Sequence, residues 1–233
     1  MRNTDWFNYG GVYREVEMFQ KPQTVIRDLF LYLDDDGIHV EAANDVPATQ
    51  AKLAIPKLDL ATTLTLTNGR AQTILQAQPD LWSPENPVLY DVTLSAGGDS
   101  VSDHVGFRRI ERRGTRILLN GQPVFLRGIS VHEDDELQGK LTSEADIRRR
   151  FAHARELGCN FLRLAHYPHH EMAARIADEM GLMLWEEIPV YWAVDFTNPA
   201  TRHDAENQLC ELIRRDRNRA SVIIWSVGNE NPD

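Results

Sequence analysis

The spacing of apolar residues changes near residue 110, and this change constrains the fold more than any other feature of the sequence. Before it, apolar and polar residues alternate in short runs separated by turn signals such as DDDG at 34–37 and AGGD at 96–99. Short alternating strands about 8–12 residues apart predict a β-sandwich. The alternating runs are 12–19, 24–33, 37–43, 62–67, 71–77, 88–96 and 100–110.

After residue 110, strands alternate with helices. A hairpin turning on Asn120-Gly121 comes first. Ser143 is a candidate N-cap for the first helix, and Gly158 stands at its end. Apolar strands covered by amphipathic helices form a parallel sheet, which right-handed crossovers curl into a doubly wound sheet or a barrel. The predicted strands are 124–131, 160–165, 182–188 and 221–228, and the helices are 143–158, 170–181 and 202–218.

Composition narrows the class of protein. The chain has 42% apolar and 26% charged residues, which is typical of soluble globular proteins. Its net charge of −10 predicts no nucleic-acid partner, and no run of about 20 apolar residues predicts a membrane span. The first residues lack the apolar region of a signal peptide, which favours a cytoplasmic location. Homo-oligomer formation stays open.

Polar residues follow the ends of all four predicted strands after residue 110. They are HEDDE at 132–136, RLAHYPHH at 163–170, WEE at 185–187 and GNE at 228–230. In a barrel these four ends share one rim, where parallel α/β folds place their chemistry. Amides and imidazoles can hold sugar hydroxyls, aromatic rings can stack on sugar faces, and a carboxylic acid can protonate a leaving oxygen. The pattern therefore favours a sugar site, and no Gly-rich loop indicates a nucleotide cofactor.

The segment RDRNRASVIIWSVGNE at 215–230 resembles the acid/base signature of glycoside hydrolase family 2, the β-galactosidase, β-glucuronidase and β-mannosidase group. The family wording is close to R-D-K-N-H-P-S-V-x-x-W-S-x-x-N-E. The resemblance implies that Glu230 is the general acid/base and that Asn229 holds the sugar 2-hydroxyl. The sequence departs from the signature at Arg219-Ala220, in the loop before the strand.

Other stretches resemble the same family in the same order. They are DWFNYGGVYR at 5–14, NGQPVFLRGISVHEDD at 120–135, NFLRLAHYPHH at 160–170 and LMLWEEIP at 182–189. The resemblance implies that Asp5 reaches the sugar, that His166 contacts it, and that Glu187 occupies the acidic position of the third barrel strand. With Asn229, these residues form the expected substrate-binding set.

The resemblance also implies a mixed fold class: an immunoglobulin-like β-sandwich followed by the first half of a TIM (β/α)8 barrel. Residues 1–19 would end a jelly-roll sugar-binding domain, 20–108 would form the sandwich, and 109–233 would form the first four β/α units of a truncated barrel. The implied activity is retaining, exo-acting hydrolysis of terminal β-linked sugars in a β-glucuronide, β-galactoside or oligosaccharide substrate, with neither cofactor nor metal.

Retaining hydrolysis also needs a nucleophilic carboxylate about 5–5.5 Å from the acid. In the family this is a Glu on the seventh barrel strand, and the pattern here reaches only the fourth. We therefore expect the chain to be a piece of a longer enzyme, inactive by itself.

Two alternatives stay open at this stage. One is a non-catalytic carbohydrate- or protein-binding module. The other is a metal-dependent barrel hydrolase using His132, Glu133, His166, His169 and His170, although the sequence lacks the H-x-H pairing common at the strand ends of such barrels.

The sequence also gives two expectations about its arginines. Arg163, within an apolar strand, needs a carboxylate partner, for which Glu187 is the candidate. The arginines at 214, 215 and 217 are expected on a solvated helix face.

Overall fold

The computed structural model describes residues 9–45 and 48–231. Asp5 lies outside the described residues. The chain forms two compact units. One is Glu17–Val124, and the other combines the segment up to Val16 with Phe125–Asp233. None of the helices in the described ranges has the length and apolar character needed to cross a membrane.

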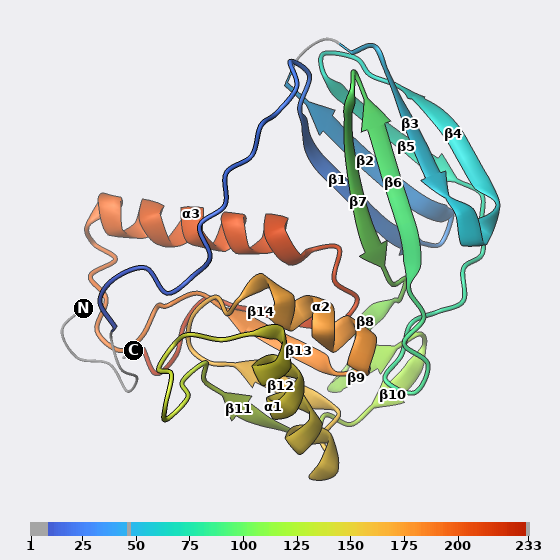
Figure 1. Cartoon of the computed structure of the whole chain (residues 1–233). Coiled ribbons are helices and arrows are strands. Elements are labelled where there is room, and N and C mark those ends of the chain that lie inside the picture. The colour runs from blue at the N-terminus through green and yellow to red at the C-terminus, as the bar shows by residue number, and fades with distance from the viewer. Residues whose placement is uncertain (1–8, 46–47, 232–233) are drawn as a thin grey trace. The chain divides into compact units, whose positions relative to one another are not determined.

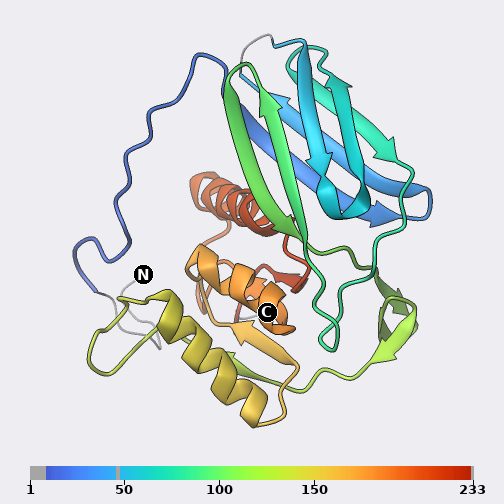
Figure 2. The same cartoon turned by 45° about the vertical axis from the view of Figure 1, so that its right-hand side comes forward.

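The Glu17–Val124 unit contains two antiparallel sheets that face each other (Figures 1 and 2). The first has the order β1-β2-β5 and the second the order β4-β3-β6-β7. The strands are β1 (Ile26–Asp34), β2 (Gly37–Asn44), β3 (Gln50–Ile55), β4 (Leu60–Thr65), β5 (Arg70–Leu75), β6 (Tyr90–Ala96) and β7 (Asp99–Val105), with a 3₁₀ turn η1 (Pro56–Leu58) between β3 and β4. This is the predicted sandwich.

Alternation along each strand builds the core of the sandwich. In β2, Ile38, Val40 and Ala42 are buried while the residues between them are less so. In β6, Tyr90, Val92 and Leu94 follow the same pattern. Every second side chain is therefore buried on one face of each sheet. The buried faces of the two sheets meet in a shared interior, which is the arrangement that stabilises a two-sheet sandwich.

Two strand predictions for the part of the chain before residue 110 were wrong. The run 12–19 is not a strand, and its apolar side chains Val12, Val16, Met18 and Phe19 are exposed. Conversely, β3 was not predicted, although it pairs with both β4 and β6 near the middle of its sheet. Its sequence QAKLAI has weak strand propensity, because Ala and Lys favour strands little. Pairing on both edges and burial of Ala51, Leu53 and Ile55 outweigh that propensity.

A small sheet of order β10-β9-β8 ends the unit. It contains β8 (Ile110–Arg113), β9 (Arg116–Leu119) and β10 (Gln122–Val124). The predicted turn at Asn120-Gly121 joins β9 to β10, with φ of 54° and 77°. Two consecutive positive φ values are those of a two-residue hairpin turn, which explains the Asn-Gly pair.

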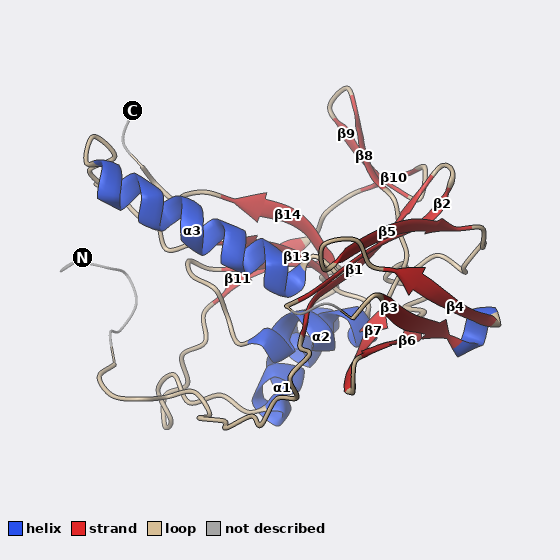
Figure 3. Ribbon diagram, turned by 90° about the horizontal axis from the view of Figure 1, so that it is seen from above, coloured by secondary structure: helices blue, strands red, loops and turns tan. Residues whose placement is uncertain are grey.

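The second unit is built on a four-stranded parallel sheet of order β11-β12-β13-β14. The strands are β11 (Gly128–Val131), β12 (Phe161–Leu164), β13 (Met183–Glu187) and β14 (Val222–Ser226). The helices are α1 (Glu144–Glu156), α2 (Glu171–Met180) and α3 (Pro199–Asp216). All four predicted strands and all three predicted helices are present (Figures 1 and 3).

Local sequence sets where these helices begin and end. Ser143 caps α1 in a reciprocal capping box with Asp146, as the N-cap prediction required. Gly181, at φ 67°, ends α2 in the left-handed conformation that glycine adopts without cost. The α3 helix begins at Pro199, three residues before the predicted start, because Asn198 caps it and proline fits the first turn.

A charged cluster is buried on the helix-covered side of the parallel sheet. Glu186 of β13 is 2% exposed, and neither of its carboxylate oxygens has a hydrogen-bond partner in the described residues. Arg215 pairs with the buried Asp216 at 2.5 Å. The solvated face predicted for Arg215 was therefore wrong, because the end of α3 turns this side chain toward the sheet.

Burial, followed by the nearby Asp216 carboxylate, raises the pKa of Glu186 well above its usual value. The folded protein therefore keeps Glu186 protonated at pH values at which the unfolded chain has already released this proton. The free energy of unfolding consequently falls as the pH rises above the usual glutamate pKa. We expect Glu186→Gln to raise the thermal midpoint at pH 8 and to change it little at pH 5. Thermal unfolding at both pH values tests this, with the exposed Glu156→Gln as control. An equal effect at the two pH values would contradict it.

Candidate active site

The carboxyl ends of the four parallel strands lie along one edge of the sheet. Register places Ser130 of β11 beside Arg163 of β12, and Arg163 beside Trp185 of β13. Glu187 of β13 lies beside Ser226 of β14. The shared edge predicted for the four strand ends is therefore present, and the polar segments that follow the strands meet there.

Glu187 occupies the centre of this edge. Its side chain is 0% exposed. Arg163 donates to Glu187 Oε2 from Nε at 3.0 Å and from Nη2 at 2.8 Å. The guanidinium also lies 4.6 Å from the centre of the Trp185 ring. The predicted pairing of Arg163 with Glu187 is confirmed, and it compensates a carboxylate that burial alone would destabilise.

The same guanidinium joins the end of β14 to the cluster. Arg163 Nη2 donates to Asn229 Oδ1 at 2.8 Å. The backbone N–H of Asn229 donates to the Val190 carbonyl at 2.8 Å. Side chain and backbone of Asn229 are thus both held, and the amide orientation is fixed with its oxygen toward Arg163.

His166 completes the central cluster. Its Nδ1 is hydrogen-bonded to Glu187 Oε1, and its side chain is 15% exposed. The ring lies 5.3 Å from the His132 ring and 5.6 Å from the Tyr191 ring. A carboxylate on Nδ1 fixes the orientation of the imidazole ring.

Tyr167 contacts His132, whose ring packs against His166 of this cluster. Its hydroxyl accepts the Glu133 backbone N–H at 3.1 Å and lies 3.3 Å from His132 Nδ1. Its ring lies between the Lys140 ammonium, 3.6 Å from the ring centre, and the His169 ring at 5.1 Å. Burial raises the pKa of Tyr167 and lowers the pKa of His132, so both groups are neutral near pH 7.

Glu133 is also buried, with 1% of its side chain exposed. It is paired with Arg14 and accepts the His170 backbone N–H at 2.6 Å. Burial acts to raise the pKa of Glu133, but the positive charges and the N–H around it outweigh burial and hold the pKa below its usual value. Glu133 therefore anchors the Arg14 segment beside the strand ends.

The imidazoles proposed for a metal site point to other partners. His169 Nε2 lies 2.9 Å from the Ala165 carbonyl, and burial lowers the pKa of His169 to about 4. His170 Nδ1 accepts the Met172 N–H at the start of α2. Within 9–45 and 48–231, no three His, Cys, Asp or Glu side chains are grouped as a metal ion would need.

Glu230 follows β14 and is exposed. Its backbone is in the left-handed region, at φ 52°. The Trp192 indole Nε1–H donates to Glu230 Oε2 at 2.8 Å. Glu230 directly follows Asn229, whose side chain is bonded to Arg163 of the Arg163–Glu187–His166 cluster.

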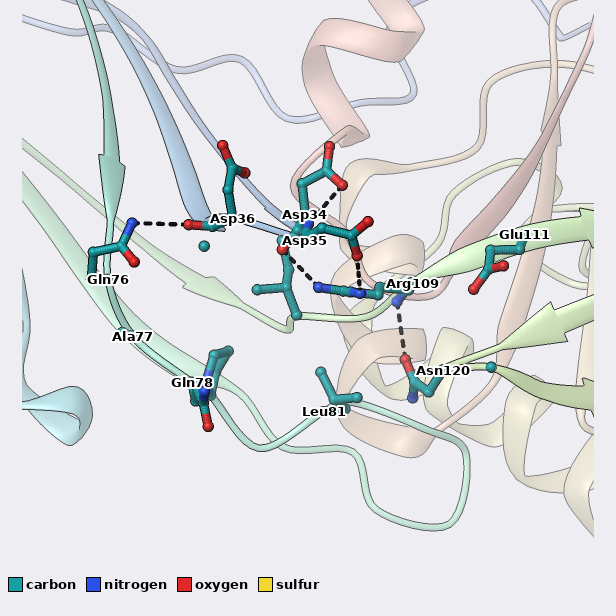
Figure 4. A pocket seen from close by; sticks show the side chains of 14 residues that line it. Asp34, Asp35, Asp36, Gln76, Ala77, Gln78, Leu81, Arg109, Glu111 and Asn120 are labelled. Atoms are coloured by element: carbon teal, nitrogen blue, oxygen red, sulfur yellow. Dashed lines mark hydrogen bonds and ion pairs between the residues drawn. The ribbon is translucent and has the colours of Figure 1, made fainter.

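A different hollow, of about 670 Å³, lies in the sandwich unit (Figure 4). Arg109 donates to Asp35 at 2.5 Å and to the Asp34 carbonyl at 2.7 Å, and Gln76 donates to the Asp36 carbonyl at 2.9 Å. These polar groups bond to one another across exposed turns, so we interpret the hollow as an ordinary solvated surface and not as a ligand site.

Comparisons with known proteins agree with this geometry. The family model described as "Glycosyl hydrolases family 2, TIM barrel domain" matches residues 110–233, and the model "Glycosyl hydrolases family 2" matches residues 32–108. The chain belongs to glycosyl hydrolase family 2. Its fold is an immunoglobulin-like sandwich followed by the first half of a TIM barrel, as predicted.

Similar proteins carry related names. The β-galactosidase of Pseudoalteromonas haloplanktis is 28% identical over 99% of this chain and 25% of its own length. The β-glucuronidase of Mus musculus is 30% identical over 97% of this chain and 37% of its own length. The apo structure of Bacteroides uniformis β-glucuronidase 3 has a TM-score of 0.83 and 29% identity, over 97% of this chain and 31% of that one. The chain thus spans between a quarter and two fifths of the length of these relatives.

Sequence reasoning missed three contributors to the site. Arg14 pairs with Glu133, which lies 119 residues away. Tyr191 and Trp192 follow β13 in a loop without regular pattern. The Tyr-Trp pair one residue after the WEEIP motif was the available signal. Aromatic residues that follow a barrel strand can line a sugar site, as can the polar residues considered there.

Proposed function

We propose that the protein acts as a retaining, exo-acting glycosidase on terminal β-linked uronides or galactosides, with Glu230 as general acid/base. The observation that carries this proposal is the exposed Glu230 carboxylate directly after Asn229, whose side chain is bonded to a cluster of Arg163, Glu187 and His166 at the ends of parallel strands. Relatives named β-galactosidase and β-glucuronidase, and a solved β-galacturonidase of Eisenbergiella tayi, support the substrate class.

The contacts suggest a different role for each of the site residues. Asn229 directs its oxygen to Arg163, so its N–H groups remain as donors for a sugar hydroxyl. His166 is held in orientation by Glu187 at Nδ1, and we propose that its ring contacts the sugar. We propose that the fully buried Glu187 acts on the sugar indirectly, by orienting His166 and Arg163.

Two further parts of the proposal come from the sequence. They are the contact of Asp5 with the sugar and the domain limits 1–19, 20–108 and 109–233.

The nucleophile is a further part of the proposal. Glu133 and Glu187 are both buried and engaged with arginine, so neither is free to attack an anomeric carbon. We propose that the attacking carboxylate is another residue, outside the described strand ends. The 233-residue chain is then expected to show no turnover of aryl β-glucuronides or β-galactosides above background. Turnover that disappears in Glu230→Gln would contradict this expectation.

The test of the whole proposal uses the protein expressed from its full open reading frame. We expect it to hydrolyse at least one of three aryl substrates, the β-glucuronide, β-galactoside or β-galacturonide, with retention of anomeric configuration followed by NMR. Inversion of configuration would overturn the mechanism. Binding of these sugars without any turnover would instead support the non-catalytic carbohydrate-binding module.

A further inference from the structure

The carboxylate of Glu230 has one hydrogen-bond partner in the described part of the chain, the Trp192 indole. That bond reaches Oε2, no bond to Oε1 is present in this part of the chain, and the residue as a whole is exposed. An indole N–H is a donor only, so it can hold a carboxylate oxygen but cannot exchange a proton with it in a catalytic cycle. The two oxygens of Glu230 are therefore distinguished by their surroundings: one is anchored and one is free.

Trp192 is itself held from several directions. Its backbone N–H donates to the Asn229 carbonyl at 3.1 Å, and the Asn231 side chain donates to the Trp192 carbonyl at 2.8 Å. Its ring lies 4.5 Å from the ring of Tyr191, which is fully buried and contacts His166. The backbone of Trp192 is in the left-handed region at φ 53°, a conformation that a bulky residue adopts only when its surroundings impose it.

These contacts join the segment after β13 to the segment after β14. Residues 190–192 and 229–231 pair across the strand ends, with an isolated parallel bridge between Tyr191 and Asn229. The loop after β13 thus reaches the carboxylate carried by β14. An exposed glutamate side chain has three rotatable bonds, and without such a partner it would occupy several rotamers.

We propose that Trp192 is the positioning residue for Glu230: its indole N–H anchors Oε2 so that Oε1 carries the proton delivered to the leaving oxygen. This inference rests on the proposed function of Glu230. Loss of the anchor should leave sugar binding nearly unchanged, since Asn229 and His166 are held by Arg163 and Glu187. It should slow proton transfer, because the acid would be correctly placed for only a fraction of the time.

The first experiment tests the contact and needs no activity. The 233-residue chain is labelled with ¹⁵N at tryptophan, and the Trp192 indole resonance is assigned from its absence in Trp192→Phe. We expect Glu230→Gln to move this resonance upfield, because a neutral amide oxygen is a weaker acceptor than a carboxylate. The exposed Glu136→Gln should leave it in place. A Trp192 resonance insensitive to Glu230→Gln would overturn the inference, whether or not the protein is a glycosidase.

The second experiment tests the role, in the protein from the full open reading frame. Trp192→Phe should lower kcat about tenfold on alkyl β-glycosides, the factor that corresponds to one net hydrogen bond, with KM nearly unchanged. Trp192→His keeps a ring N–H and should recover part of the loss, which also controls for misfolding. Equal kcat in wild type and Trp192→Phe, or a loss confined to KM, would overturn the role. Absence of any glycosidase activity in the wild type would count against the proposed function, and the resonance shift would still decide the contact.

Discussion

Replacement of Glu230 by glutamine is expected to lower kcat/KM on alkyl β-glycosides by roughly 10²–10⁴-fold in the protein expressed from its full open reading frame. The amide keeps the size of the side chain and can still accept the Trp192 N–H, so the local structure should persist. What disappears is the proton that stabilises the departing oxygen. Alkoxide leaving groups are poor, so their departure depends on that proton.

The dependence on leaving group distinguishes this role from simple loss of structure. Aryl glycosides with strongly electron-withdrawing substituents need little protonation, so their first step should be affected far less than that of alkyl glycosides. The control is Glu156→Gln, an equally conservative change of an exposed carboxylate at the end of α1. Equal losses on both kinds of substrate, or a comparable loss in the control, would argue against an acid/base role for Glu230.

The strand-end cluster could be predicted in part from the sequence because of strand geometry. Side chains alternate between the two faces of a strand, so in WEE at 185–187 the two glutamates must point to opposite sides of the sheet. The family resemblance singled out Glu187, which the sequence analysis named as the partner of Arg163, but nothing in the sequence gave a role to Glu186. The structure turns Glu187 to Arg163 and Glu186 to the buried Asp216. Both positions are charged, so hydrophobic periodicity gave no signal to separate them.

Contacts made by irregular segments were beyond prediction for a related reason. The Trp192–Glu230 bond depends on left-handed backbone at both residues, which no periodic pattern encodes for residues other than glycine. The Arg14–Glu133 pair joins residues far apart in the chain, one of them in a run that was misread as a strand. Regular elements with caps, such as α1 behind Ser143, were predictable because their determinants are local.

The largest effect on stability is expected from Arg163→Met. This change removes all three guanidinium bonds to Glu187 and the bond to Asn229, while methionine keeps the apolar contact with Trp185. Glu187 is then a fully buried carboxylate with His166 as its remaining hydrogen-bond partner in the described part of the chain. Removal of one partner from a buried ion pair costs about 3–5 kcal/mol, and the lower end applies here because Arg163 is partly solvated and His166 remains.

We expect the thermal midpoint of the protein to fall by roughly 6–12 °C, the shift that corresponds to about 3 kcal/mol in a chain of this size. Differential scanning calorimetry measures this midpoint. The matched control is Arg148→Met, which removes an exposed arginine from surface pairs with Glu144 and Glu179 and should cost at most about 1 kcal/mol. In the double variant Arg163→Met/Glu187→Gln the buried charge is absent, so it should be more stable than Arg163→Met alone. If the double variant is as unstable as the single one, the cost lies in lost packing around Arg163, and the charge of Glu187 is not what the arginine compensates.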